Sequence, residues 1–94
     1  MTLEQINTKI NEEFDTIIRE ENNEYKIIIL LKTILKRKSD NKIFLLRAKK
    51  HCTPGYEVHI YNNINSRFES IYCSIAASDI ENAYEKMLSI IEHF

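Results

Sequence analysis

The sequence predicts an α+β fold with the element order αβββα, in which two helices pack on one face of a three-stranded antiparallel sheet. Apolar residues recur with helical period at both ends of the chain and with period two in much of the middle. The 94 residues suffice for a single domain, residues 1–94, with a core of its own. Since two helices can cover only one face of such a sheet, the other face is expected to meet a partner.

The N-terminal segment predicts an amphipathic helix that ends at the polar run of residues 20–23. Thr2 and Gln5 have the spacing of a capping box, in which the hydroxyl and the amide each accept a bond from a backbone N–H of the first turn. Behind them one apolar stripe recurs mostly at intervals of three and four residues: Leu3, Ile6, Ile10, Phe14, Ile17 and Ile18. This stripe predicts the face that the helix buries.

The segment from Tyr25 to Leu35 fits a helical face as well as a strand, but its successive β-branched residues favour a strand. In a strand its odd positions are almost wholly apolar: Tyr25, Ile27, Ile29, Leu31, Thr33 and Leu35. The even positions hold Lys26, Lys32 and Lys36. The pattern therefore predicts a packing side and a lysine-bearing side.

Residues 36–55 predict a basic connection that ends in the turn Thr53-Pro54-Gly55. From Lys26 to Lys50 the chain carries nine Lys or Arg and one acid, whereas the segments on either side are acidic. The formal net charge of -1 therefore hides a polarised molecule, which bears on partners rather than on fold. Residues 43–46 are apolar enough to form a strand or a docked segment of their own, and the sequence leaves this open.

Two more strands are predicted after the connection. From Tyr56 to Tyr61 apolar and polar residues alternate, with Tyr56, Val58 and Ile60 inward and Glu57, His59 and Tyr61 outward. Residues 62–66 form the expected turn. In the strand from Arg67 to Ala76 the alternation predicts Ile71, Cys73 and Ile75 on the packing face and Phe68, Ser70, Tyr72 and Ser74 on the other.

The last segment predicts a second amphipathic helix. Ser78 is expected as its N-cap, with Glu81 completing a second capping box. Its apolar stripe consists of Ile80, Ala83, Tyr84, Met87, Leu88 and Ile91. Both helices carry acids, so the negative charge is expected on the helical side of the molecule.

No catalytic or metal-binding pattern stands out. His51, Cys52 and His59 lack a second cysteine pair, and no acid at a recognisable spacing would orient a histidine. We therefore expect no enzyme activity, no cofactor and no metal. The chain has no uncharged apolar run of eighteen residues, and Glu4 and Gln5 stand where a signal peptide would be basic and apolar. A cytoplasmic protein without membrane insertion is expected.

Nucleic-acid binding needs cations for phosphates and aromatic or polar groups for unstacked bases. The open face is expected to present Lys26, Lys32, Lys36, His59, Tyr61, Phe68 and Tyr72, with Arg67 at its border. The connection adds Arg37, Lys38, Lys42, Arg47, Lys49 and Lys50. The plainer alternative is a solvated lysine run, with Tyr61 and Tyr72 as a cross-strand pair that fills a subunit interface.

In its order of elements the chain resembles the Alu-domain proteins of the eukaryotic signal recognition particle, the fourteen-kilodalton subunit more than its nine-kilodalton paralogue. The resemblance covers nearly the whole chain. It rests on Met1-Thr2-Leu3, on Phe14 to Ile18, on Ile27 to Lys32, on the basic stretch Lys36 to Gly55, on Ala76 to Ile80 and on Ala83-Tyr84.

The resemblance implies a heterodimer with the nine-kilodalton subunit, or a homodimer, whose joined sheets bind the 5′ domain of the particle RNA. It also implies support for translation elongation arrest during co-translational targeting, with the ribosome contacted indirectly. Lys32 and the lysine and arginine residues of the connection are the positions that correspond best to the pattern of this family. A different function remains open, that of a small protein-interaction or inhibitor module without any RNA role, for which an exposed apolar patch at residues 43–46 would speak.

Overall fold

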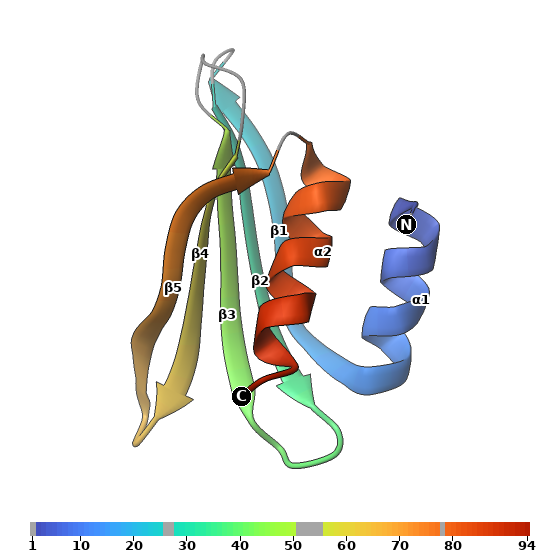
Figure 1. Cartoon of the computed structure of the whole chain (residues 1–94), viewed down its shortest axis with the longest axis vertical. Helices are drawn as coiled ribbons and strands as arrows, with labels where there is room; N and C mark the ends of the chain where they lie inside the picture. Colours follow the sequence, from blue (N-terminus) through green and yellow to red (C-terminus); the bar gives the residue numbers. More distant parts are fainter. Residues whose placement is uncertain (1, 26–27, 51–55, 78) are drawn as a thin grey trace.

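The computed structural model describes the backbone of residues 2–25, 28–50, 56–77 and 79–94, and their side chains except those of residues 20–25, 28–31, 50 and 74–77. The chain runs α1 (Leu3–Glu13), β1 (Phe14–Tyr25), β2 (Ile28–Arg37), β3 (Ile43–Lys50), β4 (Tyr56–Ile64), β5 (Arg67–Ala77) and α2 (Ile80–Ile91). The strands form one antiparallel sheet in the order β1-β2-β3-β4-β5, so each strand pairs with its neighbour in the sequence (Figure 1). The fold is α+β, but the predicted three-stranded sheet is wrong.

The first helix is capped as predicted and is shorter than predicted. The Thr2 hydroxyl accepts a bond from the backbone N–H of Gln5, and the Gln5 amide oxygen accepts one from Thr2 in return. The helix ends at Glu13, and Phe14 already has extended backbone. From there to Tyr25 the chain forms β1, so the predicted helix over residues 14–19 is wrong. The β-branched run at residues 16–18 prefers a strand, and pairing with β2 satisfies its backbone groups.

The predicted basic connection is a strand at the centre of the sheet. Only residues 38–42 form the link between β2 and β3, and Asn41 takes positive φ (61°) in that turn. β3 then alternates, with Phe44, Leu46 and Ala48 buried between exposed or half-buried neighbours. The overlap of this alternation with a dense run of Lys and Arg concealed the strand. The predicted turn at Thr53-Pro54-Gly55 lies outside the described residues.

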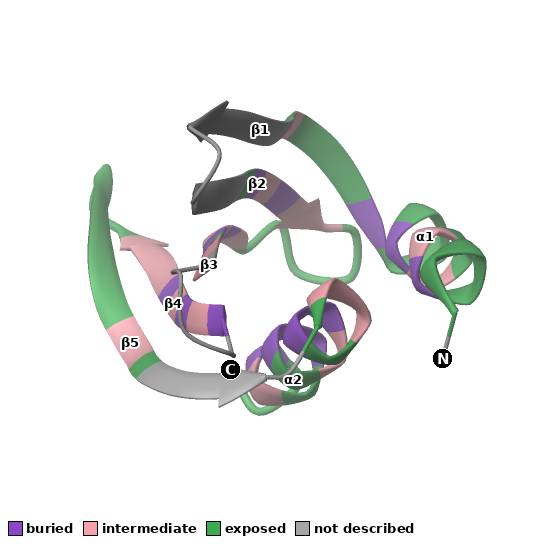
Figure 2. Cartoon of the chain, turned by 90° about the horizontal axis from the view of Figure 1, so that it is seen from above, coloured by how far each residue is buried: buried purple, intermediate pink, exposed green. Residues whose placement is uncertain are grey.

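Both helices lie on the same side of the sheet, which curls around α2 (Figure 2). The core fills the space between them: Ile6, Ile10, Phe14, Leu35, Phe44, Leu46, Ala48, Tyr56, Val58, Ile60, Ala83, Tyr84, Met87, Leu88 and Ile91. The predicted inward positions of β4 and most of the predicted stripe of α2 are confirmed by this set. The N-cap of α2 is Asp79, whose carboxylate accepts the backbone N–H of Asn82, and not Ser78, which lies outside the described residues.

A β-bulge in β5 places Tyr72 and Cys73 on the faces opposite to those predicted, while the predicted packing of Ile71 is confirmed. Ser70 lies opposite Tyr61 of β4, and Tyr72 lies opposite the adjacent residue, Ile60. Ile71 is therefore the extra residue between them. Ile71 and Tyr72 therefore both pack against the core. Beyond the bulge Cys73 is exposed, so its predicted place in the core is wrong. The side chain of Ile75 lies outside those that are described.

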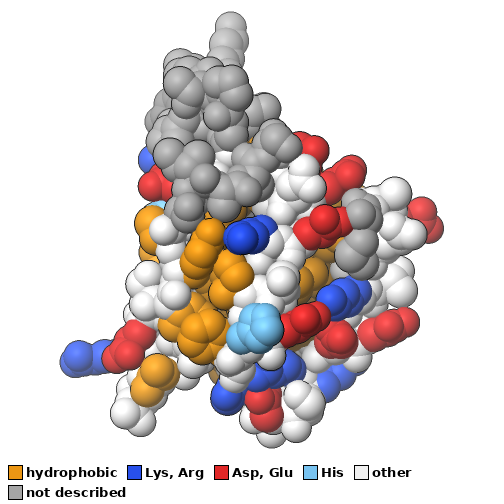
Figure 3. Space-filling view, in the orientation of Figure 1, with side chains coloured by type: hydrophobic (Ala, Val, Ile, Leu, Met, Phe, Trp, Pro, Cys, Tyr) orange, Lys and Arg blue, Asp and Glu red, His pale blue; other side chains and the backbone are white. Residues whose placement is uncertain are grey.

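The face of the sheet that is turned away from the helices, here called the outer face, is not covered by any other described part of the chain. Asp and Glu side chains gather over the helices on the opposite side (Figure 3). In the described residues, neither helix is long and apolar enough to cross a membrane.

Candidate nucleic-acid interface

The outer face presents four cations from two neighbouring inner strands, β2 and β3. Lys32 and Arg47 are exposed and lie directly opposite each other in the pairing of these strands. Lys36 and Lys49 are half-buried and stand on the same face, Lys36 four residues from Lys32 and Lys49 two residues from Arg47. At the rise of a strand, Lys32 and Lys36 are about 13 Å apart along β2. These positions place a group of cations at the middle of the sheet.

Directly opposed cations are costly in a sheet, because their side chains leave the backbone about 5 Å apart. The cost falls when an anion lies between them. Acids border these cations on both sides of the backbone pairing: Glu20 and Asp15 of β1 lie opposite Lys32 and Lys36, and Glu57 of β4 lies opposite Lys49. Arg47 has no acid opposite it, since its neighbours in the register are Lys32 and His59. Arg47, with Lys32 beside it, is therefore the most favourable centre for an anion on the outer face.

Aromatic side chains lie next to these cations on β4. The rings of His59 and Tyr61 are nearly parallel, with an angle of 8° between their planes and 6.4 Å between their centroids. Both are half-buried, so each keeps part of its surface open to solvent. Flat groups that are held parallel on a rigid strand offer stacking surfaces for unpaired bases. Cations on β2 and β3 beside rings on β4 thus combine the two kinds of contact that single-stranded nucleic acid requires.

An apolar row crosses the sheet beside the cations. Ile18, Ile34, Leu45 and Tyr61 follow one another across β1 to β4 in the strand pairing, and all four are half-buried. Ile17, the bulge residue next to Ile18 in β1, is 52% exposed. Leu45 belongs to the stretch 43–46 whose exposure the sequence left open: two of its residues line the outer face and two are in the core.

Several predicted site residues are engaged on the helical side instead. Arg37 donates to the backbone oxygen of Ile91 at 2.9 Å, and Lys38 donates to that of Asn11 at 2.9 Å. Lys42 donates to the backbone oxygen of Phe94. These three cations hold the C-terminal end of α1, and the residues at and after the C-terminal end of α2, against the sheet. They therefore lie apart from Lys32 and Arg47.

The remaining predicted residues divide as follows. Tyr72 packs against the core because of the bulge, and the ammonium group of Lys86 lies 6.0 Å from its ring centroid. Arg67 is exposed at the start of β5. Lys26 lies outside the described residues, as does the side chain of Lys50, whose backbone pairs with Tyr56.

A wide cleft of about 750 Å³ lies where the ends of α1 and α2 meet the link between β2 and β3. Two ion pairs engage three of its lining residues, Arg37, Asp40 and Glu92. Arg37 binds the Asp40 carboxylate through two bonds of 3.0 and 2.7 Å, and Glu92 binds Lys9 at 2.8 Å. These ion pairs join charged groups along the wall of the cleft, so we interpret the cleft as a structural junction.

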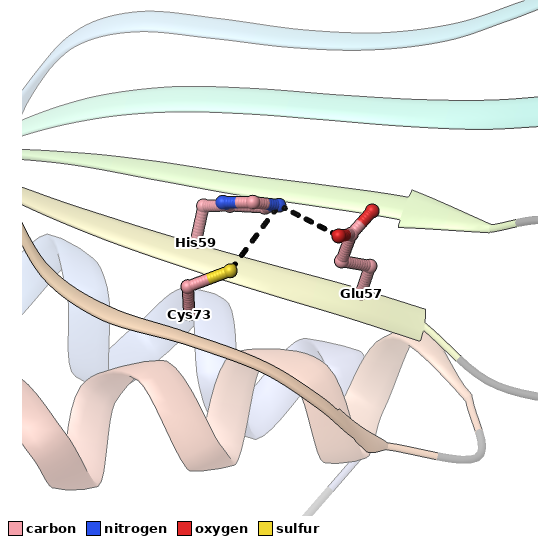
Figure 4. Close-up of side chains that lie close together, drawn as sticks. All are labelled: Glu57, His59 and Cys73. Carbon is pink, nitrogen blue, oxygen red and sulfur yellow. Dashed lines mark hydrogen bonds and ion pairs between the residues drawn. The ribbon is translucent and has the colours of Figure 1, made fainter.

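The structure also brings together a cluster that the sequence did not indicate, formed by Glu57, His59 and Cys73. Glu57 and His59 are two residues apart on β4, and Cys73 is the partner of His59 on β5 (Figure 4). The alternation of Cys73 with Ile71 and Ile75 had suggested a core position. No local signal marks the bulge that turns Cys73 outward, because the bulge is defined by pairing with β4.

Comparison with protein-family models, with curated proteins and with solved structures finds no match to this chain.

Proposed function

We propose that this protein binds single-stranded segments of RNA through the outer face of its sheet and has no catalytic role in doing so. The observation that carries the proposal is the opposed pair of Lys32 and Arg47 at the middle of the sheet, beside the parallel rings of His59 and Tyr61. The cations would contact phosphates, and the rings would stack on unpaired bases.

The narrower form of this proposal is an Alu-domain subunit that binds the particle RNA as a heterodimer or homodimer and supports elongation arrest. It rests on the sequence resemblance alone. The five-stranded sheet differs from the αβββα fold that this resemblance implies. Residues 14–18, one of the segments on which the resemblance rests, form a strand and not a helix. We therefore base the proposal on the outer face itself and use the particle RNA as one probe among others.

The test is a fluorescence-anisotropy titration with three probes: an unstructured RNA, a DNA of the same sequence and the Alu RNA with and without the nine-kilodalton partner. If four phosphates are neutralised, affinity for a single strand should fall about fiftyfold between 50 and 200 mM salt. The double variant Lys32→Glu, Arg47→Glu should bind at least tenfold more weakly, with a salt slope that is smaller by about 1.4.

The matched control is Lys86→Glu, which reverses an exposed cation on α2 and leaves the outer face unchanged. It is compared with the single variant Lys32→Glu, which changes the net charge by the same amount. Equal losses in these two variants would mean that only the overall charge matters, and would contradict an interface on the outer face. Binding of the Alu RNA only together with the partner would support the narrower form. Absence of binding to every RNA would refute both forms.

A second candidate is a protein-interaction module, and the apolar row of Ile18, Ile34, Leu45 and Tyr61 favours it. A protein partner would cover this row, whereas RNA binding depends on the cations beside it. Leu45→Lys should then abolish capture of one specific protein, in a manner insensitive to ribonuclease. The same substitution should preserve or strengthen RNA binding if the first proposal holds, since it adds a cation to the outer face.

A further inference from the structure

Three different donor atoms converge at the β4–β5 side of the outer face. They are Oε1 of Glu57, Nε2 of His59 and Sγ of Cys73, and all lie within 4.8 Å of one another. The histidine nitrogen stands between the other two, 3.4 Å from the carboxylate oxygen and 3.9 Å from the sulfur (Figure 4). Carboxylate oxygen, imidazole nitrogen and thiolate sulfur are the three ligand types that zinc takes in proteins.

The separations fit a shared ion better than a hydrogen-bonded chain. In a tetrahedral zinc site the usual bond lengths put nitrogen and oxygen ligands about 3.4 Å apart, and put sulfur about 3.6 Å from either. The measured nitrogen–oxygen distance of 3.4 Å agrees with this geometry, and the sulfur–nitrogen distance of 3.9 Å is slightly longer. Small rotations of the Cys73 and Glu57 side chains would bring the sulfur and the oxygen into range.

The arrangement does not suit a cysteine nucleophile with a histidine base. In such a triad the nucleophile bonds one ring nitrogen and the acid bonds the other, so that a proton taken by the imidazole is balanced across the ring. Here Cys73 and Glu57 both approach Nε2 of His59. Two groups that approach the same nitrogen cannot pass a proton through the ring from one side to the other. A single ion bound by all three atoms requires this arrangement.

The sheet holds the three side chains in place. Residues two apart on a strand point to the same face, which places Glu57 beside His59, and cross-strand pairing places Cys73 opposite His59. The side chains of Glu57 and His59 are 31% and 26% exposed, and Cys73 is exposed, so an ion can enter from solvent. On the β3 side, Arg47 lies opposite His59 and Lys49 opposite Glu57. Their repulsion of a cation is opposed by the negative charges of the thiolate and the carboxylate.

We propose that Glu57, His59 and Cys73 bind one zinc ion tetrahedrally, with the fourth position open to solvent. Cys73 binds as the thiolate and releases its proton to water when the ion enters. The proposal goes beyond RNA binding and does not depend on it, because the metal is measured in the absence of any nucleic acid.

The test uses Co²⁺ as a spectroscopic probe, added to reduced, chelator-treated Cys52→Ser protein, in which Cys73 is the remaining cysteine. One Co²⁺ per chain should give a thiolate-to-cobalt charge-transfer band and the strong visible bands of tetrahedral cobalt, and Zn²⁺ should displace it. Glu57→Gln, His59→Gln and Cys73→Ser, each made in this background, should each weaken binding at least tenfold. Cys73→Ser should also remove the charge-transfer band.

The matched control is Glu69→Gln, which makes the same chemical change at an exposed glutamate of β5 outside the cluster. It should bind cobalt as the Cys52→Ser protein does. Circular dichroism establishes that each variant is folded, which is expected because the three ligands lie on the surface. Absence of a charge-transfer band in folded Cys52→Ser protein, or a weak octahedral spectrum, would overturn the proposal. So would unchanged affinity in folded Cys73→Ser protein.

Discussion

The guanidinium group of Arg37 lies over the ring of Phe44, with its central carbon 5.2 Å from the ring centroid. The two residues come from neighbouring strands, and the same guanidinium also donates to the backbone oxygen of Ile91, in the last turn of α2. This carbonyl also accepts the backbone N–H of Phe94 at 3.1 Å, so Arg37 provides its second hydrogen bond. Arg37 thereby joins β2, β3 and α2 at one point, even though its place in a basic run suggested a role in binding.

Replacement of Arg37 by Ala should destabilise the fold by about 2–3 kcal/mol, because it removes a charged hydrogen bond and a cation–π contact from a side chain that is only 16% exposed. Arg37→Lys should recover only part of this, since an ammonium group cannot reproduce the planar fork. Urea unfolding followed by circular dichroism gives the free energies. Arg67→Ala, at an exposed arginine at the start of β5, should change stability by less than about 0.5 kcal/mol. Equal effects of Arg37→Ala and Arg67→Ala would contradict this role.

Stability should fall with acid in a way that depends on Asp40. The hydrogen bond from Arg37 lowers the pKa of this carboxyl from 3.8 to about 2. Since the folded-state pKa lies below the unfolded value, the contribution is fully present above about pH 4 and is lost as pH falls toward 2. The bond from Lys9 lowers the pKa of Glu92 and acts in the same direction.

The measurement is the thermal midpoint between pH 2 and pH 7. Asp40→Asn should be less stable than the unmodified protein at pH 7, and the difference between them should shrink below pH 4. Combining it with Glu92→Gln should flatten the profile further. An acid profile that is the same with and without Asp40 would show that the pair with Arg37 does not contribute.

Neighbouring leucines in β3 should respond very differently to truncation. Leu46 is fully buried between the sheet and the helices, so Leu46→Ala should cost about 2–5 kcal/mol through lost burial and the cavity left behind. Leu45 is half-buried on the outer face, and Leu45→Ala should cost about 1 kcal/mol or less. Chemical denaturation of the two variants tests the alternation directly. Similar losses would argue against β3 as a strand.

The thiol of Cys73 should react with an aromatic disulfide reagent in the native protein. In the Cys52→Ser variant, without metal, its rate should be close to that of the denatured chain, because the bulge turns this side chain to solvent. The double variant Cys52→Ser, Cys73→Ser supplies the blank. Protection until the protein unfolds would place Cys73 in the core, as the simple alternation predicts.

A glycine in the tight turn between β4 and β5 should stabilise the fold. Asn65 and Ser66 both have positive φ, 52° and 65°, which is the backbone of a type I′ hairpin turn. Serine pays a steric cost at that position that glycine avoids, so Ser66→Gly should stabilise the fold by about 0.5–1 kcal/mol. Ser66→Ala keeps the steric cost and should bring no gain. Thermal unfolding compares the two, and a stabilising Ser66→Ala would contradict the explanation.

Part of the candidate site could be predicted from the sequence. Lys32, His59 and Tyr61 stand where period-two alternation places them, because these residues lie in stretches whose inward positions are plainly apolar. Arg47 and Lys49 were predicted to bind but were assigned to a connection, so their positions beside Lys32 and Glu57 could not be foreseen. Tyr72 and Cys73 were assigned to the wrong faces, because one bulge residue exchanges the two faces of everything that follows it.

The sequence by itself determined the features that depend on a few neighbouring residues: the capping box of Thr2 and Gln5, the apolar stripe of α2 and the alternation of β4. Only the tertiary structure decided where α1 ends, that β3 lies at the centre of a five-stranded sheet, and that Cys73 meets His59. The physical reason is that a helix satisfies its backbone groups within the segment, whereas a strand depends on a neighbouring strand for its hydrogen bonds and for its register.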